Sequence, residues 1–223
     1  MSIHILSLEC STKNCSVSIG TNGDNNCLCE ELSPDFKHSE NLHTFIQWAL
    51  EGAELELNNM HAIAVGKGPG SYTGLRIGLA AAKGLCVGLD IPLISIDSLE
   101  ILAYPFFESD YDYIIPVMDA RRMEVYTTVF DKMGNKLEIT KPHILQEDSF
   151  YAYKNKTVLF VGDASEKTEK FLKENSLTYT DSFSFITSYP SAENMNPLSH
   201  KKFNNKSFED IAYFDPLYLK EWK

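Results

Sequence analysis

A glycine-rich segment, "GKGPGSYTGLRIGLAAAKGL" at residues 66–85, most constrains what this chain can fold into. Three glycines and a proline occupy its first five residues, directly after a short apolar run. Glycine permits positive φ and a tight reversal, and proline stiffens that reversal. The small apolar residues that follow have helical spacing. The segment therefore predicts a strand, a tight loop and a helix over 71–87, with Ser71 or Thr73 as the N-cap.

The spacing of this loop excludes two catalytic versions of it. A P-loop requires Gly-Lys followed by Ser or Thr after a gap of four residues, and no such triplet follows. A nucleophile elbow around Ser71 requires glycines where the chain has Pro69 and Thr73. The glycines therefore indicate a requirement of backbone geometry rather than of chemistry.

The helix itself carries a second set of small residues. One smooth stripe is formed by Gly74, Gly78, Ala81, Ala82 and Leu85, next to Leu75 and Leu79 and flanked by Arg76 and Lys83. Each interior glycine costs about 1 kcal/mol in helix propensity relative to alanine, so another element must approach closely to offset that cost. Two alternatives remain open. The stripe packs on the sheet of its own lobe, or one side of it packs on a partner chain.

The order of the elements indicates an internal repeat. "IHILSLE" (3–9) and "CSVSIG" (15–20) predict a hairpin of two strands, and an amphipathic helix follows from residue 39. Residues 5–19 align on 115–129, which places Glu9 on Asp119, and 157–165 resembles 62–70 in pattern. We therefore predict an α/β fold of two related lobes, each a mixed sheet with flanking helices.

The boundaries of the lobes follow from this repeat. We predict an N-terminal lobe over 1–106, to which 207–223 returns, and a C-terminal lobe over 107–206.

Composition narrows the class of function. The net charge of −11 makes the chain a poor autonomous binder of nucleic acid, although a local basic patch or a partner could supply positive charge. No apolar run reaches membrane-spanning length and no signal peptide is evident, which predicts a cytoplasmic location. The five cysteines lack the paired spacing of zinc ligands, so we expect buried thiols and no metal site.

Two acids occupy equivalent places in the repeat. Glu9 and Asp119 each end the first strand of their copy, where the strand ends of stacked lobes would meet, and Ser11 and Thr12 are nearby phosphate donors. Such a set suits a magnesium–nucleotide site, whereas the alternative is that both acids cap hairpin turns. Because neither hairpin loop contains glycine, the sequence predicts a vestigial cleft rather than tight nucleotide binding.

The chain resembles the TsaB family, the bacterial accessory subunit for threonylcarbamoyl modification of adenosine in tRNA. The resemblance covers most of residues 3–131 and the carboxyl end, and its segments are "ILSLECST", "CSVSI", "HSENL", "AIAVGKGPGSYTGLRIGLAAAKGL", "IDSLEILA", "MDARRMEVY" and "DPLYLKEW". The glycine segment is the most specific of them. The resemblance implies an actin/sugar-kinase/Hsp70-like fold, with lobes of the actin/RNase H type.

The resemblance also implies a role without catalysis. The family binds a paralogous catalytic subunit (TsaD-like), which an ATPase subunit (TsaE-like) joins. The complex uses ATP and magnesium to place threonylcarbamoyl on N6 of adenosine 37 in tRNAs that read ANN codons. The family contacts tRNA through the complex and forms a homodimer when alone. We expect no tightly bound cofactor in this chain and no contact with a membrane.

The resemblance places the partner interface on two helices that match residues 39–51 and 71–87. The predicted interface comprises Leu42, Phe45, Ile46, Gly74, Leu75, Arg76, Gly78, Leu79, Ala82 and Lys83. Two residues depart from the family pattern: Glu9 stands where aspartate is usual, and His43 is an additional histidine that we expect at a boundary or interface.

Two other functions remain as alternatives. The chain could be an enzyme by itself, a metallopeptidase or a small-molecule kinase or ATPase, but the sequence has neither a metal triad nor glycine phosphate loops. It could also be a self-associating protein whose dimer is the functional form.

Overall fold

The computed structural model describes residues 2–33, 38–175 and 181–220, with the main chain alone for 38–40. It divides into two compact units. The first contains Met1–Ile101 and Pro190–Tyr218, and the second contains Leu102–Tyr189 and Leu219–Lys223. The boundary falls within helix α3 (Ser98–Ala103).

The first unit is built on a five-stranded mixed sheet in the order β3-β2-β1-β4-β5. Its strands are β1 (His4–Glu9), β2 (Asn14–Thr21), β3 (Asp24–Leu32), β4 (Ala62–Gly66) and β5 (Leu93–Ile96). β1 runs antiparallel to β2 and parallel to β4, with Glu9 opposite Ser16. The predicted hairpin is confirmed, and β3 continues it as an antiparallel edge strand.

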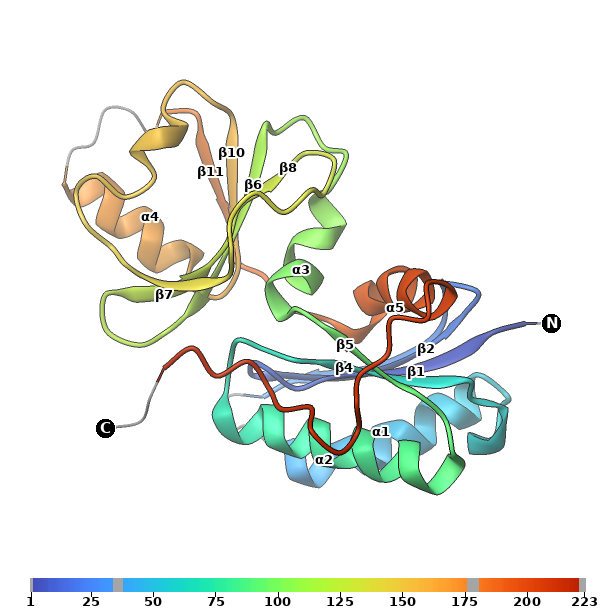
Figure 1. The fold of residues 1–223 in the computed structure, drawn as a ribbon. Coiled ribbons are helices and arrows are strands. Elements are labelled where there is room, and N and C mark those ends of the chain that lie inside the picture. The colour runs from blue at the N-terminus through green and yellow to red at the C-terminus, as the bar shows by residue number, and fades with distance from the viewer. Residues whose placement is uncertain (1, 34–37, 176–180, 221–223) are drawn as a thin grey trace. The chain divides into compact units, whose positions relative to one another are not determined.

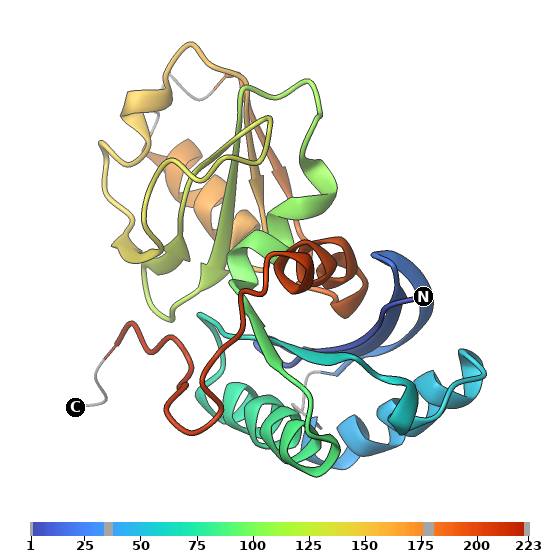
Figure 2. The same cartoon turned by 45° about the vertical axis from the view of Figure 1, so that its right-hand side comes forward.

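Helices cover both faces of this sheet. Figures 1 and 2 show α1 (His38–Gly52) and α2 (Tyr72–Leu89) on one face and α5 (Met195–Asn204) on the other. Both predicted helices are confirmed, and Ser71 is the N-cap of α2, because its Oγ accepts the Gly74 N–H at 3.3 Å. Short 3₁₀ turns lie at Leu57–Asn59, Tyr104–Phe106, Tyr151–Tyr153 and Ala192–Asn194.

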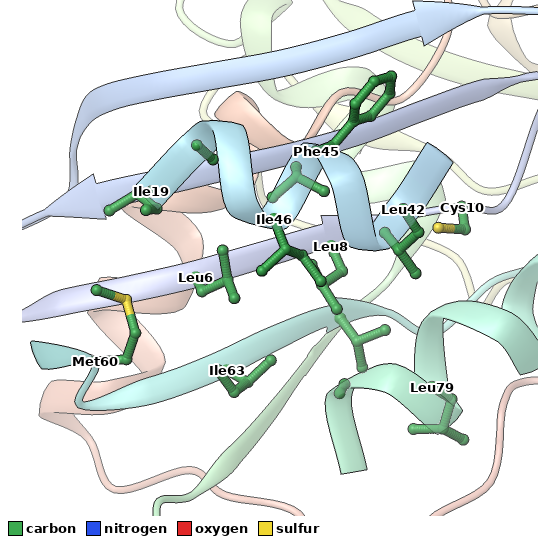
Figure 3. Close-up of a cluster of buried hydrophobic side chains, with 14 of the residues drawn as sticks. Leu6, Leu8, Cys10, Ile19, Leu42, Phe45, Ile46, Met60, Ile63 and Leu79 are labelled. Atoms are coloured by element: carbon green, nitrogen blue, oxygen red, sulfur yellow. The ribbon is translucent and has the colours of Figure 1, made fainter. Parts of the chain in front are cut away.

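The core between the sheet and the α1–α2 layer is apolar. Its central side chains lie close together in Figure 3 and include Leu6, Leu8, Ile63, Leu42, Ile46 and Leu79. The alternation of apolar residues along β1 and the helical spacing along α1 direct these side chains to the same layer. This burial is the main stabilising contribution to the unit.

The opposite face of the sheet is partly polar, and the segment 190–206 covers it. Asn196 of α5 donates to the Ser18 Oγ at 2.8 Å, and Ser16 Oγ accepts the Ala192 N–H at 2.9 Å. The predicted C-terminal lobe includes 190–206, whereas the structure groups this segment with the first unit. Conversely, 102–106 and Leu219–Lys223, predicted with the N-terminal lobe, fall in the second unit. Two kinds of contact hold the segment 190–206 on the first sheet: these hydrogen bonds, and apolar packing of Ala192 and Met195 in one cluster with residues of β1, β4 and β5.

The second unit repeats the strand pattern of the first. Its sheet has the order β11-β10-β6-β7-β9, with β8 also paired to β6. The elements are β6 (Tyr113–Asp119), β7 (Glu124–Thr127), β8 (Phe130–Asp131), β9 (Lys141–Ile144), β10 (Val158–Val161), α4 (Ser165–Glu174) and β11 (Phe183–Ile186).

In both units the first strand pairs antiparallel with the next strand and parallel with a later one, which is parallel to the last strand. The outermost pair on the other side is antiparallel in both sheets. The prediction of two related lobes with mixed sheets is confirmed. Glu9 and Asp119 end the equivalent strands β1 and β6.

The cysteines differ in accessibility. Cys10, Cys15 and Cys86 are buried, whereas Cys27 and Cys29 on β3 are partly exposed. A hydrogen bond with Cys15, together with burial, raises the pKa of Cys10, and burial raises the pKa of Cys86 to about 11. The thiolate is the reactive form, so a raised pKa lowers reactivity near neutral pH.

Burial and the neighbouring Cys27 also raise the pKa of Cys29. We therefore expect iodoacetamide to alkylate Cys27 of the folded protein first, Cys29 more slowly, and the buried Cys10, Cys15 and Cys86 last. Peptide mass spectrometry after short exposures near pH 8 would measure the order, with the protein in denaturant as the control in which all five react. Rapid labelling of Cys86 in the folded protein would contradict this assignment.

Candidate protein-binding face on the first unit

Most residues of the predicted partner interface lie in the interior of the first unit. Of the ten, only Arg76 and Lys83 have accessible side chains. The buried ones are Leu42, Phe45, Ile46, Gly74, Leu75, Gly78, Leu79 and Ala82. In the isolated chain these eight lie in the layer beneath the surface, and their contact with a partner stays a prediction.

Gly78 explains the orientation of α2. A Cβ at Gly78 would lie 3.4 Å from the Cys10 side chain and 3.7 Å from Val65, both on the adjacent sheet. The glycine therefore lets the helix backbone approach β1 and β4 closely. Gly74, Gly78 and Ala82 of the predicted stripe therefore pack in the interior of their own lobe, whereas Ala81 and Leu85 at its edge are partly accessible. The alternative that a partner chain covers the other side of the stripe stays a prediction.

A second row of small residues lies on the other side of α2. We call Ile77, Ala80, Ala81, Gly84, Val87 and Gly88 the outer face. A Cβ added at Gly84 or Gly88 would meet no described atom within 4 Å, and Val87 is 71% exposed. The residues of this face are not among the predicted interface residues, although Ala80, Gly84 and Gly88 follow the i, i+4, i+8 pattern of one helix side.

Helix α1 extends the accessible apolar surface of this layer. Trp48 is 53% exposed, and its ring centroid lies 5.8 Å from that of the buried Phe45. His43 is also exposed, which agrees with a boundary position. Exposed large apolar side chains beside a smooth helix face are typical of surfaces that bind another protein.

Positive charge borders the outer face along one edge. Arg76 and Lys83 lie on α2, which has no acidic residue between Tyr72 and Leu89. Together with Leu79 and Ala80 they line an open groove, whose other wall is formed by Asp215, Pro216 and Tyr218. The Leu217 N–H donates to the Lys67 carbonyl at 2.8 Å and fixes this terminal segment beside α2.

Glu9 is committed to hydrogen bonds inside the first unit. Its side chain is fully buried, and its carboxylate accepts the Ser11 N–H at 2.6 Å and the Ser98 hydroxyl at 3.2 Å. Ser98 Oγ in turn accepts the Gly68 N–H at 3.2 Å. A Cβ at Gly66 would lie 1.9 Å from the carboxylate, so this position of β4 requires glycine. Glu9 thus joins the end of β1 to the glycine loop.

The other residues of the predicted vestigial cleft have separate surroundings. Ser11 and Thr12 are buried beside Glu9 in the first unit. Asp119 is accessible in the second unit, where it forms an ion pair with Lys167 and accepts the Arg121 N–H at 3.0 Å. Each acid is therefore engaged within its own unit, and a nucleotide site at these residues stays a prediction.

In the part of the chain that the structure describes, no three His, Cys, Asp or Glu side chains are grouped so that they could hold a metal ion. None of the described helices combines the length and the apolarity needed to cross a bilayer.

Comparison with known proteins gives the family. The model of the family described as "TsaD: tRNA N6-adenosine threonylcarbamoyltransferase" matches residues 35–214. The tRNA threonylcarbamoyladenosine biosynthesis protein TsaB of Bacillus subtilis is 31% identical over 172 residues, which cover 75% of each chain. The chain belongs to the TsaB family. TsaB of Escherichia coli is 28% identical over 232 residues, which cover 99% of this chain and 97% of the relative.

Solved structures agree with this family at the level of fold. YeaZ from Pseudomonas aeruginosa has a TM-score of 0.76 and 22% identity, with 97% of this chain and 100% of that chain covered. A second chain, described as an uncharacterised protein from the same species with similarity to peptidase YeaZ, has a TM-score of 0.79 and 22% identity, with 98% and 100% covered. The two-lobed α/β fold expected from the TsaB resemblance is confirmed.

We expect Glu9→Ala to lower the free energy of unfolding by about 1–3 kcal/mol, because it leaves the buried Ser11 N–H and Ser98 hydroxyl without their acceptor. Glu9→Gln keeps one acceptor oxygen and a similar volume, so its loss should be clearly smaller. Urea unfolding followed by circular dichroism would measure both. Equal stability of Glu9→Ala and the wild type would contradict the structural role of this carboxylate.

Proposed function

We propose that the chain is the non-catalytic scaffold subunit of the complex that places threonylcarbamoyl on N6 of adenosine 37 in ANN-reading tRNAs. It binds and supports the catalytic paralogue, a TsaD-like transferase. The observation that carries the proposal is the outer face of α2, a smooth apolar surface on which a Cβ added at Gly84 or Gly88 would meet no described atom within 4 Å.

Membership of the TsaB family supports this role, because the relatives are named for biosynthesis of the same modified nucleoside. The match to a transferase family model supports a common ancestry with the catalytic paralogue. In such a pair of related subunits of one fold, the paralogue catalyses the transfer and this chain acts as the scaffold.

The interior of the first unit supports the absence of catalysis in this chain. The acid at the end of β1 is fully buried and accepts hydrogen bonds from Ser11 and Ser98. A catalytic carboxylate must instead reach a substrate proton or a metal-bound phosphate. A metallopeptidase would require a cluster of metal ligands, which the described residues do not form.

The remaining parts of the proposal follow from the family. An ATPase subunit of the TsaE type joins the pair, and the complex uses ATP and magnesium. tRNA is held by the complex, in keeping with a net charge of −11 on this chain. The subunit is cytoplasmic and pairs with itself when the catalytic paralogue is absent.

A leucine at Gly84 should block binding of the catalytic paralogue while the protein stays folded. Position 84 is open, so a leucine side chain projects into the space that a partner helix would occupy. We expect a loss of affinity of about tenfold or more, since one bulky side chain disrupts a closely packed interface centre. Isothermal titration calorimetry with the purified paralogue would measure it.

Gly78→Leu is the matched control on the buried side of α2. Its side chain would meet Cys10 and Val65, so we expect it to destabilise the first unit rather than act on binding alone. Thermal unfolding separates the two effects. Full binding and full tRNA modification by a folded Gly84→Leu protein would exclude the outer face as the docking site.

A further inference from the structure

Arg76 is held in a fixed position at the edge of the outer face. Its Nε donates to the Tyr218 hydroxyl at 3.0 Å, and its guanidinium carbon lies 4.0 Å from the centre of the Tyr72 ring. The Tyr72 and Tyr218 rings are 5.1 Å apart and support each other. Stacking on aromatic rings restricts the guanidinium before any partner arrives, which lowers the entropy cost of binding.

The two cations of α2 have no carboxylate partner among the described residues. Neither Arg76 nor Lys83 forms an ion pair within residues 2–33, 38–175 and 181–220, although five other ion pairs are present there. In a chain with a net charge of −11, α2 itself thus carries positive charge and no acid along this edge. Asp215 lies on the opposite wall of the same groove and forms no ion pair with either cation among the described residues. An arginine fork binds a carboxylate in bidentate fashion, and a lysine binds one as a point charge.

The position of Lys83 disfavours pairing of α2 with itself. In a two-fold symmetric contact, residues near the axis meet their own copies. If two α2 helices pack antiparallel through the smooth centre between Ala80 and Gly84, the axis passes near residue 82. The two copies of Lys83 are then only about 3 Å apart along the helix direction, on the same edge of the contact. Like charges at such positions repel each other.

We propose that Arg76 and Lys83 select the partner of the outer face: a helix of the catalytic paralogue that carries carboxylates at the matching edge, in preference to a second copy of this chain. Arg76 binds one carboxylate of the partner helix through its remaining N–H groups, and Lys83 binds a second. The groove beside them accommodates the aliphatic parts of the partner's acidic side chains. This inference rests on the proposed function, because it names the chemistry by which the paralogue is recognised.

Lys83→Gln separates this proposal from a merely structural role, since it should move two equilibria in opposite directions. Loss of the positive charge removes an attraction in the complex with the paralogue and a repulsion in the self-pair. We expect affinity for the paralogue to fall about fivefold at low salt and self-association to strengthen by a few-fold. Sedimentation velocity measures the self-pair, and calorimetry measures the complex.

Arg76 is tested by two substitutions. Arg76→Gln removes the charge and should weaken the complex about tenfold, whereas Arg76→Lys keeps the charge and should recover part of that loss. Raising the salt from about 0.05 to about 0.5 M should reduce the difference between each variant and the wild type.

Lys201→Gln is the matched control. It removes the same charge from an exposed position on α5, on the opposite face of the sheet, and should change neither equilibrium. Circular dichroism of every variant shows whether it is folded.

The outcomes distinguish failure of the proposed function from failure of the selective role of Arg76 and Lys83. If the wild type does not bind the paralogue, the proposed function fails and this inference fails with it. If the wild type binds and both Lys83→Gln and Arg76→Gln bind equally well, only the inference is overturned. If Lys83→Gln weakens both associations, its effect is structural and the selective role of the charge is rejected. If the protein is monomeric with and without the substitution, the complex with the paralogue decides.

Discussion

The close approach of α2 to its own sheet decides which side of that helix remains outside. Gly78 has no Cβ, and the backbone of α2 can therefore lie against Cys10 and Val65 at the ends of β1 and β4. A larger residue would hold the helix away from the sheet or rotate it about its axis. Either change would move Arg76, Gly84 and the groove with respect to α1, so the surface proposed for binding depends on contacts that a partner never touches.

Glycine is accommodated for different reasons on the two sides of this helix. Gly78 is small because the unit's own side chains fill the space beside it, whereas Gly84 faces open space. Both cost helix propensity by about the same amount. The cost at Gly78 is offset by packing within the unit. The cost at Gly84 has no such compensation within the described chain, which is why we assign that compensation to another chain.

The sequence predicts those features that local spacing determines. The first hairpin, the α1 and α2 helices, the Ser71 N-cap and the repeat of the sheet all follow from alternation, helical periodicity and order. Arg76 and Lys83, which the resemblance places at the partner interface, are accessible, and their role there stays a prediction. The sequence could not predict whether the glycine stripe faces the sheet or the outside. Helical periodicity gives the angle between residues around a helix, but not the direction in which the sheet lies.

The assignment of 190–206 was wrong for a related reason. The apolar spacing of Ala192, Met195 and Leu198 does not indicate which of the two sheets these residues cover. The accompanying hydrogen bonds join Asn196 to Ser7 and Ser18. Such bonds depend on residues about 180 positions apart and leave no local signal.

The arrangement also separates stability from recognition within one layer. The side chains that stabilise the α1–α2 layer are apolar and buried, and they depend little on salt. The side chains that we assign to partner selection are two cations at an accessible edge, where interactions are weaker and depend on salt. Under the proposed function, a change at this edge would alter which chain binds without disturbing the fold. Two cations there would then distinguish the paralogue from a second copy of this chain without a change in the core.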